Sequence, residues 1–200
     1  SSFPQLQLFK RGITQLSGNE FTPLAAEEIK QLNNDVYIVR FKVPENKEVE
    51  MGVSSYFYLR PSEKGTPRAF TPISRINAKG HIDFLIKCYP TGGIGERVRK
   101  LKVGDTIDIR GPLLKMDFRE HKKNLNKIGM IAGGTGVAPM YQILREVLEE
   151  DSKTEFYLMY ANRTEADVVY KDELDQLASK YKNFKVFFLF HFFHFFISFF

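Results

Sequence analysis

The spacing of apolar residues changes once along this chain, and that change limits the folds open to it. Up to Pro112, four short segments place apolar residues two apart and end at Pro or Gly: VYIVRFKVP, SSYFYLRP, HIDFLIKCYP and DTIDIRGP. From Asn126 onward, apolar strand-like segments alternate with the helical patterns PMYQILREVLEE and VYKDELDQLASKYK, and FKVFFLF starts a third strand. The sequence therefore predicts an antiparallel β barrel or sandwich and then an α/β unit, joined through the polar stretch DFREHKKNLNK.

The composition argues against several kinds of site. A formal net charge of +5 suggests an anionic partner, but the basic residues have no aromatic or Arg-rich context, which argues against nucleic acid. Cys88 is the only cysteine, which excludes an internal disulfide and a cysteine-based metal site and fits a reducing compartment. Its alternation with Ile86 predicts a packed core position. His191 and His194 have no Cys, Asp or Glu in the tail to complete a metal site.

Both ends of the chain differ from the rest. Residues 1–15 are interpreted as an N-terminal extension with neither a signal peptide nor a spanning helix. Residues 186–200 hold nine of the 19 Phe and no charge, and they are too short to span a bilayer, which takes about 20 apolar residues. Three interpretations remain open: a membrane anchor, a buried strand continuing from NFKVFFLF, or an aberrant stretch that replaces the natural continuation. The third is favoured, because T-rich codons read from an intron or in a wrong frame encode mostly Phe.

Two stretches in the first half offer groups that bind anions. In RAFTPIS, Arg68 precedes the Thr71–Pro72 pair, which offers a bidentate grip on a phosphate and a hydroxyl on a rigid backbone. In TGGIGERVRKL, glycine leads into a helical pattern whose first backbone N–H groups can hold an anion. Each stretch alone is also compatible with an ordinary strand and turn.

The stretch KIGMIAGGTGVAPMYQIL carries a more specific signal. An apolar strand enters a Gly-rich turn, and Pro139 starts a helix. This pattern allows close backbone approach and places the positive end of a helix dipole where a dinucleotide pyrophosphate can bind. It departs from G-x-G-x-x-G, and a tight strand-to-helix connection is the alternative.

Taken in order, these stretches resemble the NADH-cytochrome b5 reductase family within the ferredoxin-reductase-like flavoenzymes. The resemblance runs from Leu16 to Lys185 through RAFTPIS, LIKCYPTGG, VGDTIDIRGP, AGGTGVAPMYQIL and YANRTEADVVYKDELDQL. GPLLK and YANRTEADV are most similar to the mitochondrial branch. The resemblance implies an antiparallel FAD-binding β barrel in residues 16–120 and an incomplete Rossmann-like NADH-binding α/β domain in residues 121–185, so that the chain is truncated at its C-terminus.

The resemblance also implies which residues hold the cofactors FAD and NADH. Arg68 would pair with FAD phosphate, Thr71 would bond near the reactive flavin nitrogen, and Lys87 would lie beside flavin and nicotinamide, so Thr71 and Lys87 are the expected catalytic residues. Thr135 would lie between the cofactors, and the charge of Asp167 near the adenine ribose would favour NADH over NADPH. The other expected cofactor-binding residues are Ala69, Phe70, Leu85, Gly92, Gly93, Ile94, Gly95 and Glu96 for FAD, and Gly133, Gly134, Gly136 and Pro139 for NADH.

The implied activity is transfer of hydride from NADH to FAD, followed by release of single electrons to cytochrome b5 or a similar acidic haem protein. Basic side chains in ERVRKLK and EHKKNLNK would face this partner. The resemblance further implies a monomer inside the cell at the surface of mitochondria or the endoplasmic reticulum. Membrane association would come from the tail or from an N-terminal anchor.

Three departures from the family predict impaired activity. Phe70 replaces the usual Tyr, and Gly95 and Glu96 stand where a Ser or Thr usually lies near the FAD phosphate, so FAD should bind more weakly. The family's further strands, the last with Cys-Gly-Pro-Pro, have no counterpart in this sequence, which would expose the edge of the strand KIGMIA. We therefore expect FAD binding with poor or absent NADH-driven reduction. A non-catalytic FAD-binding remnant or a membrane-tethered variant is the alternative.

Overall fold

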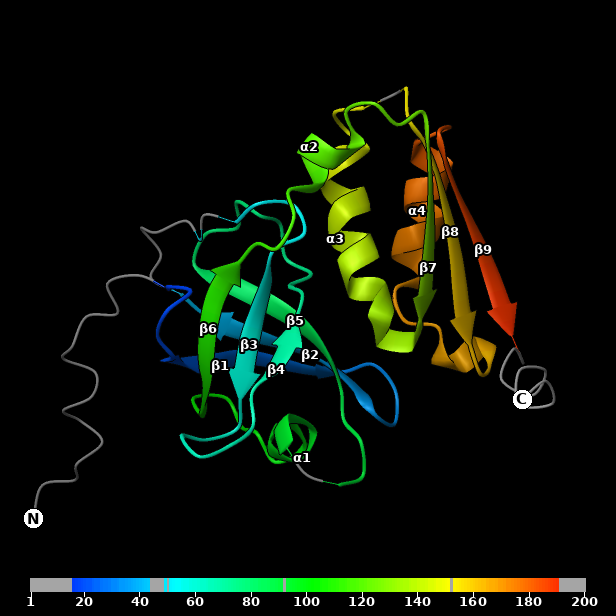
Figure 1. Cartoon of the computed structure of the whole chain (residues 1–200). Coiled ribbons are helices and arrows are strands. Elements are labelled where there is room, and N and C mark those ends of the chain that lie inside the picture. Colours follow the sequence, from blue (N-terminus) through cyan, green and yellow to red (C-terminus); the bar gives the residue numbers. More distant parts are fainter. Residues whose placement is uncertain (1–15, 44–48, 50, 92, 152, 191–200) are drawn as a thin grey trace, which may run out of the picture.

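The protein consists of two halves, each built on a sheet of a different kind (Figure 1). The structure is a computed structural model that describes residues 16–43, 49, 51–91, 93–151 and 153–190. The N-terminal half holds a six-stranded antiparallel sheet, and the C-terminal half holds a three-stranded parallel sheet with helices. The predicted order, an antiparallel half and then an α/β half, is confirmed.

The antiparallel sheet provides the frame of the N-terminal half. Its strands are β1 (Thr22–Gln31), β2 (Val36–Lys42), β3 (Tyr56–Arg60), β4 (Arg68–Phe70), β5 (His81–Lys87) and β6 (Thr106–Leu113), and α1 (Gly93–Arg99) follows β5. The strand order is β4-β3-β6-β1-β2-β5. Within the described residues, one isolated bridge between Pro72 and Phe84 joins the segment just after the outer strand β4 to the other outer strand, β5. The predicted barrel is therefore not closed by a continuous hydrogen-bonded ladder.

The inward-facing residues of this sheet form a core of their own. The Phe84 ring lies fully buried, with its centroid 6.1 Å from that of Phe41 and 5.7 Å from that of Phe57. Cys88 is buried in the same cluster, which confirms the predicted core position. Leu85 faces the opposite side of β5 and packs against the C-terminal half.

The C-terminal half alternates strands and helices as predicted. Its elements are β7 (Lys127–Gly133), η3 (Gly134–Gly136), α3 (Val137–Val147), β8 (Glu155–Asn162), η4 (Glu165–Asp167), α4 (Lys171–Lys180) and β9 (Phe184–Phe190). The parallel strands follow the order β7-β8-β9, so right-handed crossovers place α3 and α4 on the same face of the sheet (Figure 1). The predicted third strand FKVFFLF is confirmed as β9, so residues 186–190 of the Phe-rich stretch belong to the sheet. The rest of the tail, including His191 and His194, lies outside the described residues.

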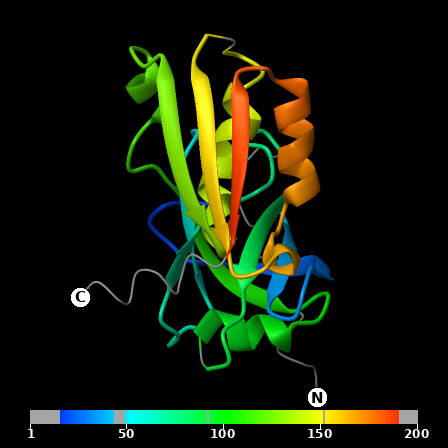
Figure 2. The same ribbon diagram turned by 90° about the vertical axis from the view of Figure 1, so that its right-hand side faces the viewer.

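The other face of the parallel sheet carries exposed apolar residues. Ile131, Met159 and Phe187 lie in register across the three strands and are 76%, 42% and 48% exposed. Figure 2 shows this face with no described helix over it. β7 is an edge strand among the described residues, as predicted. In the described part of the chain, no helix combines the length and apolar character needed to cross a membrane.

The core of the C-terminal half extends onto the N-terminal half. Val36, Val53, Ile73 and Leu85 of the N-terminal half share one buried cluster with α3 residues such as Leu144. Helix α3 therefore packs against both its own sheet and the antiparallel half.

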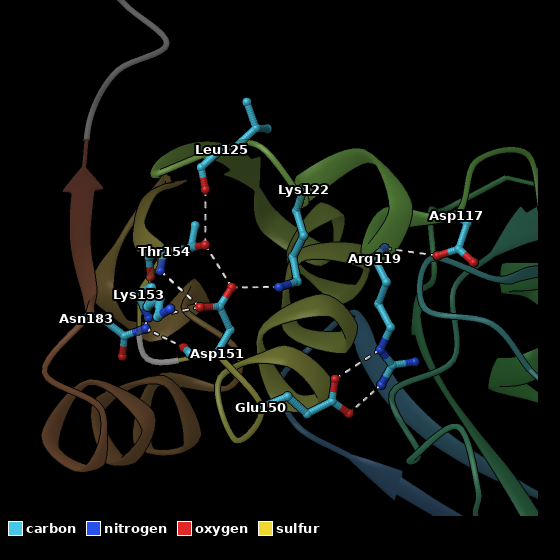
Figure 3. Close-up of polar contacts among 9 residues, drawn as sticks. All are labelled: Asp117, Arg119, Lys122, Leu125, Glu150, Asp151, Lys153, Thr154 and Asn183. Carbon is cyan, nitrogen blue, oxygen red and sulfur yellow. Dashed lines mark hydrogen bonds and ion pairs between the residues drawn. The ribbon is translucent and has the colours of Figure 1, made fainter.

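The polar stretch predicted as a linker contains a short helix, α2 (Phe118–Lys122). Asp117 caps this helix by accepting a hydrogen bond from the backbone N of Arg119 at 2.9 Å. The Arg119 guanidinium binds Glu150, just beyond α3, with Nη2 and Oε1 2.6 Å apart (Figure 3). The linker is therefore fastened to the C-terminal half.

Asp151 is the centre of the polar network in Figure 3. Its Oδ2 lies 2.6 Å from Nζ of Lys122 and accepts a bond from Oγ1 of Thr154 at 2.7 Å, while Oδ1 accepts bonds from two backbone N–H groups. Burial by itself would raise the pKa of Asp151, but these bonds hold it well below its usual range. Asn183 donates to the backbone O of Asp151 at 2.8 Å and so ties the start of β9 to the same network.

Candidate functional site

A cavity of about 680 Å³ opens in the N-terminal half beside β4, β5 and α1. The cations Lys64, Arg68 and Lys87 line it, and its described lining residues include no carboxylate. Arg68 is exposed and forms no ion pair with any residue that the structure describes. Phe70 and Tyr89 add aromatic surface. These walls suit an anionic ligand that also carries a planar ring, because guanidinium groups bind phosphate and aromatic side chains stack on rings.

Glycine allows α1 to approach this cavity closely. Gly93 has a φ of +68°, in the left-handed region that other residues rarely adopt. A Cβ on Gly95 would lie 2.9 Å from Cα of Cys88, so α1 can pack this close to the end of β5 only with glycine there. Gly93, Ile94 and Gly95 line the cavity, and Gly92 lies outside the described residues.

A second cavity of about 240 Å³ lies where β7 and β8 end. Gly133, Gly134 and Thr135, from the predicted glycine turn, form one part of its wall. Arg163 and Asp167 also line it, so this cavity carries charge of both signs.

Local hydrogen bonds hold the Asp167 carboxylate at the second cavity. Its Oδ2 accepts a bond from the backbone N of Thr164 at 3.1 Å and from Oγ1 of the same residue at 2.8 Å. This capping box begins η4 directly after β8. The carboxylate is therefore fixed in place before any ligand binds.

The two cavities adjoin, because Lys87, Tyr89 and Thr135 line both of them. Lys87 is the last residue of β5, and its Nζ lies 3.4 Å from Oδ2 of Asp35 and 6.0 Å from the centroid of the Tyr89 ring. The structure thus brings together Lys87 and Thr135, which the resemblance placed beside both cofactors. Ligands in the two cavities would meet at this junction.

Six of the expected site residues line neither cavity in the part of the chain described. Leu85 is buried in the core shared by the two halves. Glu96 is exposed and accepts a hydrogen bond from Lys100 at 2.8 Å, which lowers the pKa of Glu96. Thr71 directly follows β4 and is partly buried. The other three are Ala69, Gly136 and Pro139.

Sequence reasoning missed several residues that line the cavities. Tyr89 is 63% exposed and stands two residues after Lys87, so the alternation in IKCYP offered a signal. Asn162 and Arg163 lie within YANRTEADV, which contributed to the resemblance but not to the site. Asp35 comes from the turn between β1 and β2, and only the fold reveals its contact with Lys87.

Comparison with known proteins divides the chain between residues 118 and 130, where the antiparallel half ends and the parallel half begins. Residues 23–118 match the family described as "Oxidoreductase FAD-binding domain". Residues 130–193 match the family described as "Oxidoreductase NAD-binding domain". The first match contains all of β1 except Thr22 and continues through β6, and the second contains most of β7 and all of the elements that follow it.

Known relatives that match most of the chain are named as NADH-dependent reductases. It is 36% identical over 174 residues to NADH-cytochrome b5 reductase 2 of Mycosarcoma maydis, a match that covers 82% of this chain and 49% of the relative. It is 34% identical over 194 residues to nitrate reductase [NADH] 1 of Arabidopsis thaliana, covering 86% of this chain and 21% of that protein. The chain thus spans about half the length of the first relative and about a fifth of the second.

A solved structure shares the arrangement of the two halves. The cytochrome b5 reductase domain of Ulva prolifera nitrate reductase superposes with a TM-score of 0.78 and 28% sequence identity. The superposition covers 86% of this chain and 74% of that domain.

Proposed function

Because this chain belongs to the oxidoreductases that join an FAD-binding domain to an NAD-binding domain, we propose that it is an NADH-dependent flavoprotein reductase of the cytochrome b5 reductase type. The observation that carries the proposal is the junction of the two cavities at Lys87, Tyr89 and Thr135. A reductase of this kind needs its two cofactors in contact, and the junction supplies a place where they can meet.

The larger cavity fits FAD. Arg68 is free of carboxylate partners in the described structure and would pair with the diphosphate, while Phe70 would pack against the ring system. The backbone at Gly93 and Gly95 leaves room for close approach. Thr71, at the end of β4, is proposed to donate a hydrogen bond to the flavin.

The smaller cavity fits the nicotinamide nucleotide. Backbone groups of Gly133 and Gly134 and the hydroxyl of Thr135 would face it at the end of β7. The fixed Asp167 carboxylate would repel a 2′-phosphate, which supports a preference for NADH. Arg163 carries the opposite charge in the same cavity and would reduce that preference.

Bound FAD would accept a hydride from NADH and pass the electrons singly to a second protein. The chain contributes position and charge rather than acid or base chemistry. Lys87, paired with Asp35, would place its positive charge beside the flavin and nicotinamide rings. Thr135 would lie between the two cofactors and help to position them.

The acceptor that we propose is cytochrome b5 or a similar acidic haem protein. The names of the relatives and the basic residues of α1 and α2 support this choice. We further propose that the protein acts as a monomer inside the cell, at the surface of mitochondria or the endoplasmic reticulum. The resemblance to NADH-cytochrome b5 reductases supports this location.

The test uses the 200-residue chain loaded with FAD and mixed with NADH in the absence of oxygen. Because the sequence predicts poor NADH-driven reduction in this chain, the proposal expects NADH to bleach the flavin absorbance slowly, and oxidised cytochrome b5 added afterwards to restore it. A chain that binds no FAD would contradict the proposal. Bound FAD that dithionite reduces but NADH does not would favour the alternative, a non-catalytic flavin-binding protein. A Lys171→Gln variant is a suitable control, because Lys171 pairs with Asp175 on α4 and lines neither cavity.

A further inference from the structure

Helix α3 is bound to the N-terminal half by a buried side chain at its middle. Gln142 is 1% exposed, and its Oε1 accepts a hydrogen bond from the backbone N of Ser54 at 2.8 Å. Its Nε2 donates to the backbone O of Ser55 at 3.2 Å and of Pro72 at 3.4 Å. One side chain therefore joins two separate segments of the N-terminal half to α3.

The segment after Thr71 makes further bonds to α3. Nη1 of Arg145 donates to the backbone O of Ile73 at 2.5 Å. Arg75 pairs with Glu149 at 3.1 Å, but both side chains are more than a third exposed, so this pair contributes little. The backbone N of Ile76 also donates to Oε1 of buried Glu146 at 3.4 Å. The bonds of Gln142, Arg145 and Glu146 are thus the main polar links between this segment and α3.

Ser54 shows that the Gln142 contact constrains the backbone. Its φ is +80°, which is uncommon for a residue with a side chain and persists where the surroundings enforce it. The bond from its N–H to Gln142 and the bond from its Oγ to the backbone O of Met116, at 2.5 Å, supply that constraint.

The start of α3 lies at the junction of the two cavities. The helix begins at Val137, directly after the glycine turn that carries Thr135. Seven residues separate Thr135 from Gln142, which corresponds to a distance of about 10 Å along a helix axis. We infer that Gln142 is a positioning residue that sets the separation between the turn carrying Thr71 and the turn carrying Thr135. Its effect on hydride transfer rests on the proposed function, whereas its effect on the geometry does not.

The variant that tests this inference is Gln142→Met. Methionine keeps the length of the side chain and removes all three hydrogen bonds. The matched control is Arg119→Gln, which removes another bond between the linker and the end of α3. That bond joins exposed side chains and does not involve the segments that Gln142 holds.

The separation of the halves can be measured directly by spin labels. Lys102→Cys and Gln176→Cys place labels at exposed positions of the two halves, and native Cys88 is too buried to react in the folded protein. We expect one narrow distance distribution for the parent chain and for Arg119→Gln, and a broadened or shifted one for Gln142→Met. A distribution for Gln142→Met that matches the parent chain would overturn the inference, whether or not NADH reduces the flavin.

The second readout separates positioning from general stability. In the FAD-loaded chain, Gln142→Met should slow hydride transfer by about 10- to 100-fold, because small displacements of reacting groups cost this much, while the affinities for FAD and NADH change little. If the parent chain is not reduced by NADH, the proposed function fails and the distance measurement still decides the inference. Equal losses in rate and in both affinities would indicate a purely structural role.

The conservative variant Gln142→Glu should restore part of the parent geometry as the pH falls. In Gln142→Glu, burial should favour the neutral carboxyl at mildly acidic pH, where it can donate one bond to the backbone O of Ser55 or Pro72. We expect the distance distribution to narrow toward that of the parent chain as the pH falls. A distribution insensitive to pH would count against the inference, and this variant decides it if Gln142→Met does not fold.

Discussion

The two halves of the molecule bury their apolar residues in different ways. The antiparallel half encloses Phe41, Phe57 and Phe84 within its own sheet. The parallel half covers one face of its sheet with α3 and α4 and exposes Ile131 and Phe187 on the other (Figure 2). The core of the parallel half also continues onto the antiparallel half. The first half therefore has a core of its own, whereas the core of the second half is shared with its neighbour.

This difference separates the two cavities. Apart from Thr135, the described residues that line the larger cavity come from the antiparallel half. The smaller cavity needs both halves, because Asn33 and Asp35 come from the first and Arg163 and Asp167 from the second. Flavin binding should therefore survive changes that loosen the parallel half, whereas NADH binding should not.

The largest expected effect comes from truncating one buried ring in each half. Phe84→Ala and Phe156→Ala both remove fully buried side chains, and each should lower the free energy of unfolding by about 3–5 kcal/mol. Phe84→Ala should raise hydrogen exchange in both halves and abolish FAD binding. Phe156→Ala should raise exchange in the parallel half alone and leave FAD bound. Equal loss of FAD binding in the two variants would show that the halves fold as one unit.

Removing the Arg68 cation from the larger cavity should change the affinity for FAD alone. Arg68→Ala should weaken FAD binding by about 10- to 100-fold, since a hydrogen bond to a charged group contributes about 1.5–3 kcal/mol. Flavin fluorescence titration measures this change. Arg97→Ala is the control, because Arg97 pairs with Asp105 and does not line the cavity. Unchanged FAD affinity in Arg68→Ala would refute the assignment of Arg68 to the phosphate.

The Asp151 network should stabilise the parallel half in a pH-dependent way. Asp151→Asn should cost about 1–3 kcal/mol of unfolding free energy at neutral pH, because the charged bond to Lys122 is lost. The pKa of Asp151 is lowered on folding, so its contribution is present above the unfolded value of about 3.9 and is lost as pH falls through the lower folded value.

Urea unfolding of Asp151→Asn at a series of pH values tests this sign. The variant and the parent chain should differ most near neutral pH and converge under acid conditions. Glu120→Gln is the control, since Glu120 and Lys123 are both 62% exposed and their pair should contribute less than about 1 kcal/mol. A difference that grows as the pH falls would contradict the direction of the Asp151 shift.

The smallest effect on stability is expected from a substitution on the exposed face of the parallel sheet. Phe187→Ser should change the free energy of unfolding by less than about 0.5 kcal/mol, and it should reduce aggregation and dye binding to apolar surface. Phe188→Ser is the matched change on the opposite face of β9, where the Phe188 ring lies 6.1 Å from that of Tyr160. A large loss of stability in Phe187→Ser would show that the face is covered in solution.

The sequence predicted the parallel half better than the antiparallel half. Each strand and helix of the parallel half has a strong apolar period, and all three strands and both α-helices were found where expected. In contrast, β1 was missed, because TPLAAEEIKQ has adjacent glutamates and alanines and no clear alternation. Pairing with β2 and β6 makes it a strand, and the register shift between Ala26 and Glu28 disrupts the alternation.

The site could be predicted where one short motif supplies several residues. RAFTPIS and AGGTGVAP placed Arg68, Phe70 and Thr135 at cavities because strand ends and turns carry them there. The ion pair between Lys87 and Asp35 could not be predicted, because it depends on the pairing of β2 with β5 across 52 positions of sequence. Long-range register of this kind is set by the whole sheet and not by local pattern.

The most direct measurement is the absorbance of the FAD-loaded 200-residue chain at wavelengths beyond its flavin bands, recorded during anaerobic mixing with NADH. A nicotinamide ring stacked on flavin gives a charge-transfer band there, so the shared boundary at Lys87, Tyr89 and Thr135 predicts that this band appears as the flavin is bleached. NADH that binds in competition with ADP-ribose, but produces neither the band nor bleaching, would show that the two cofactors do not meet.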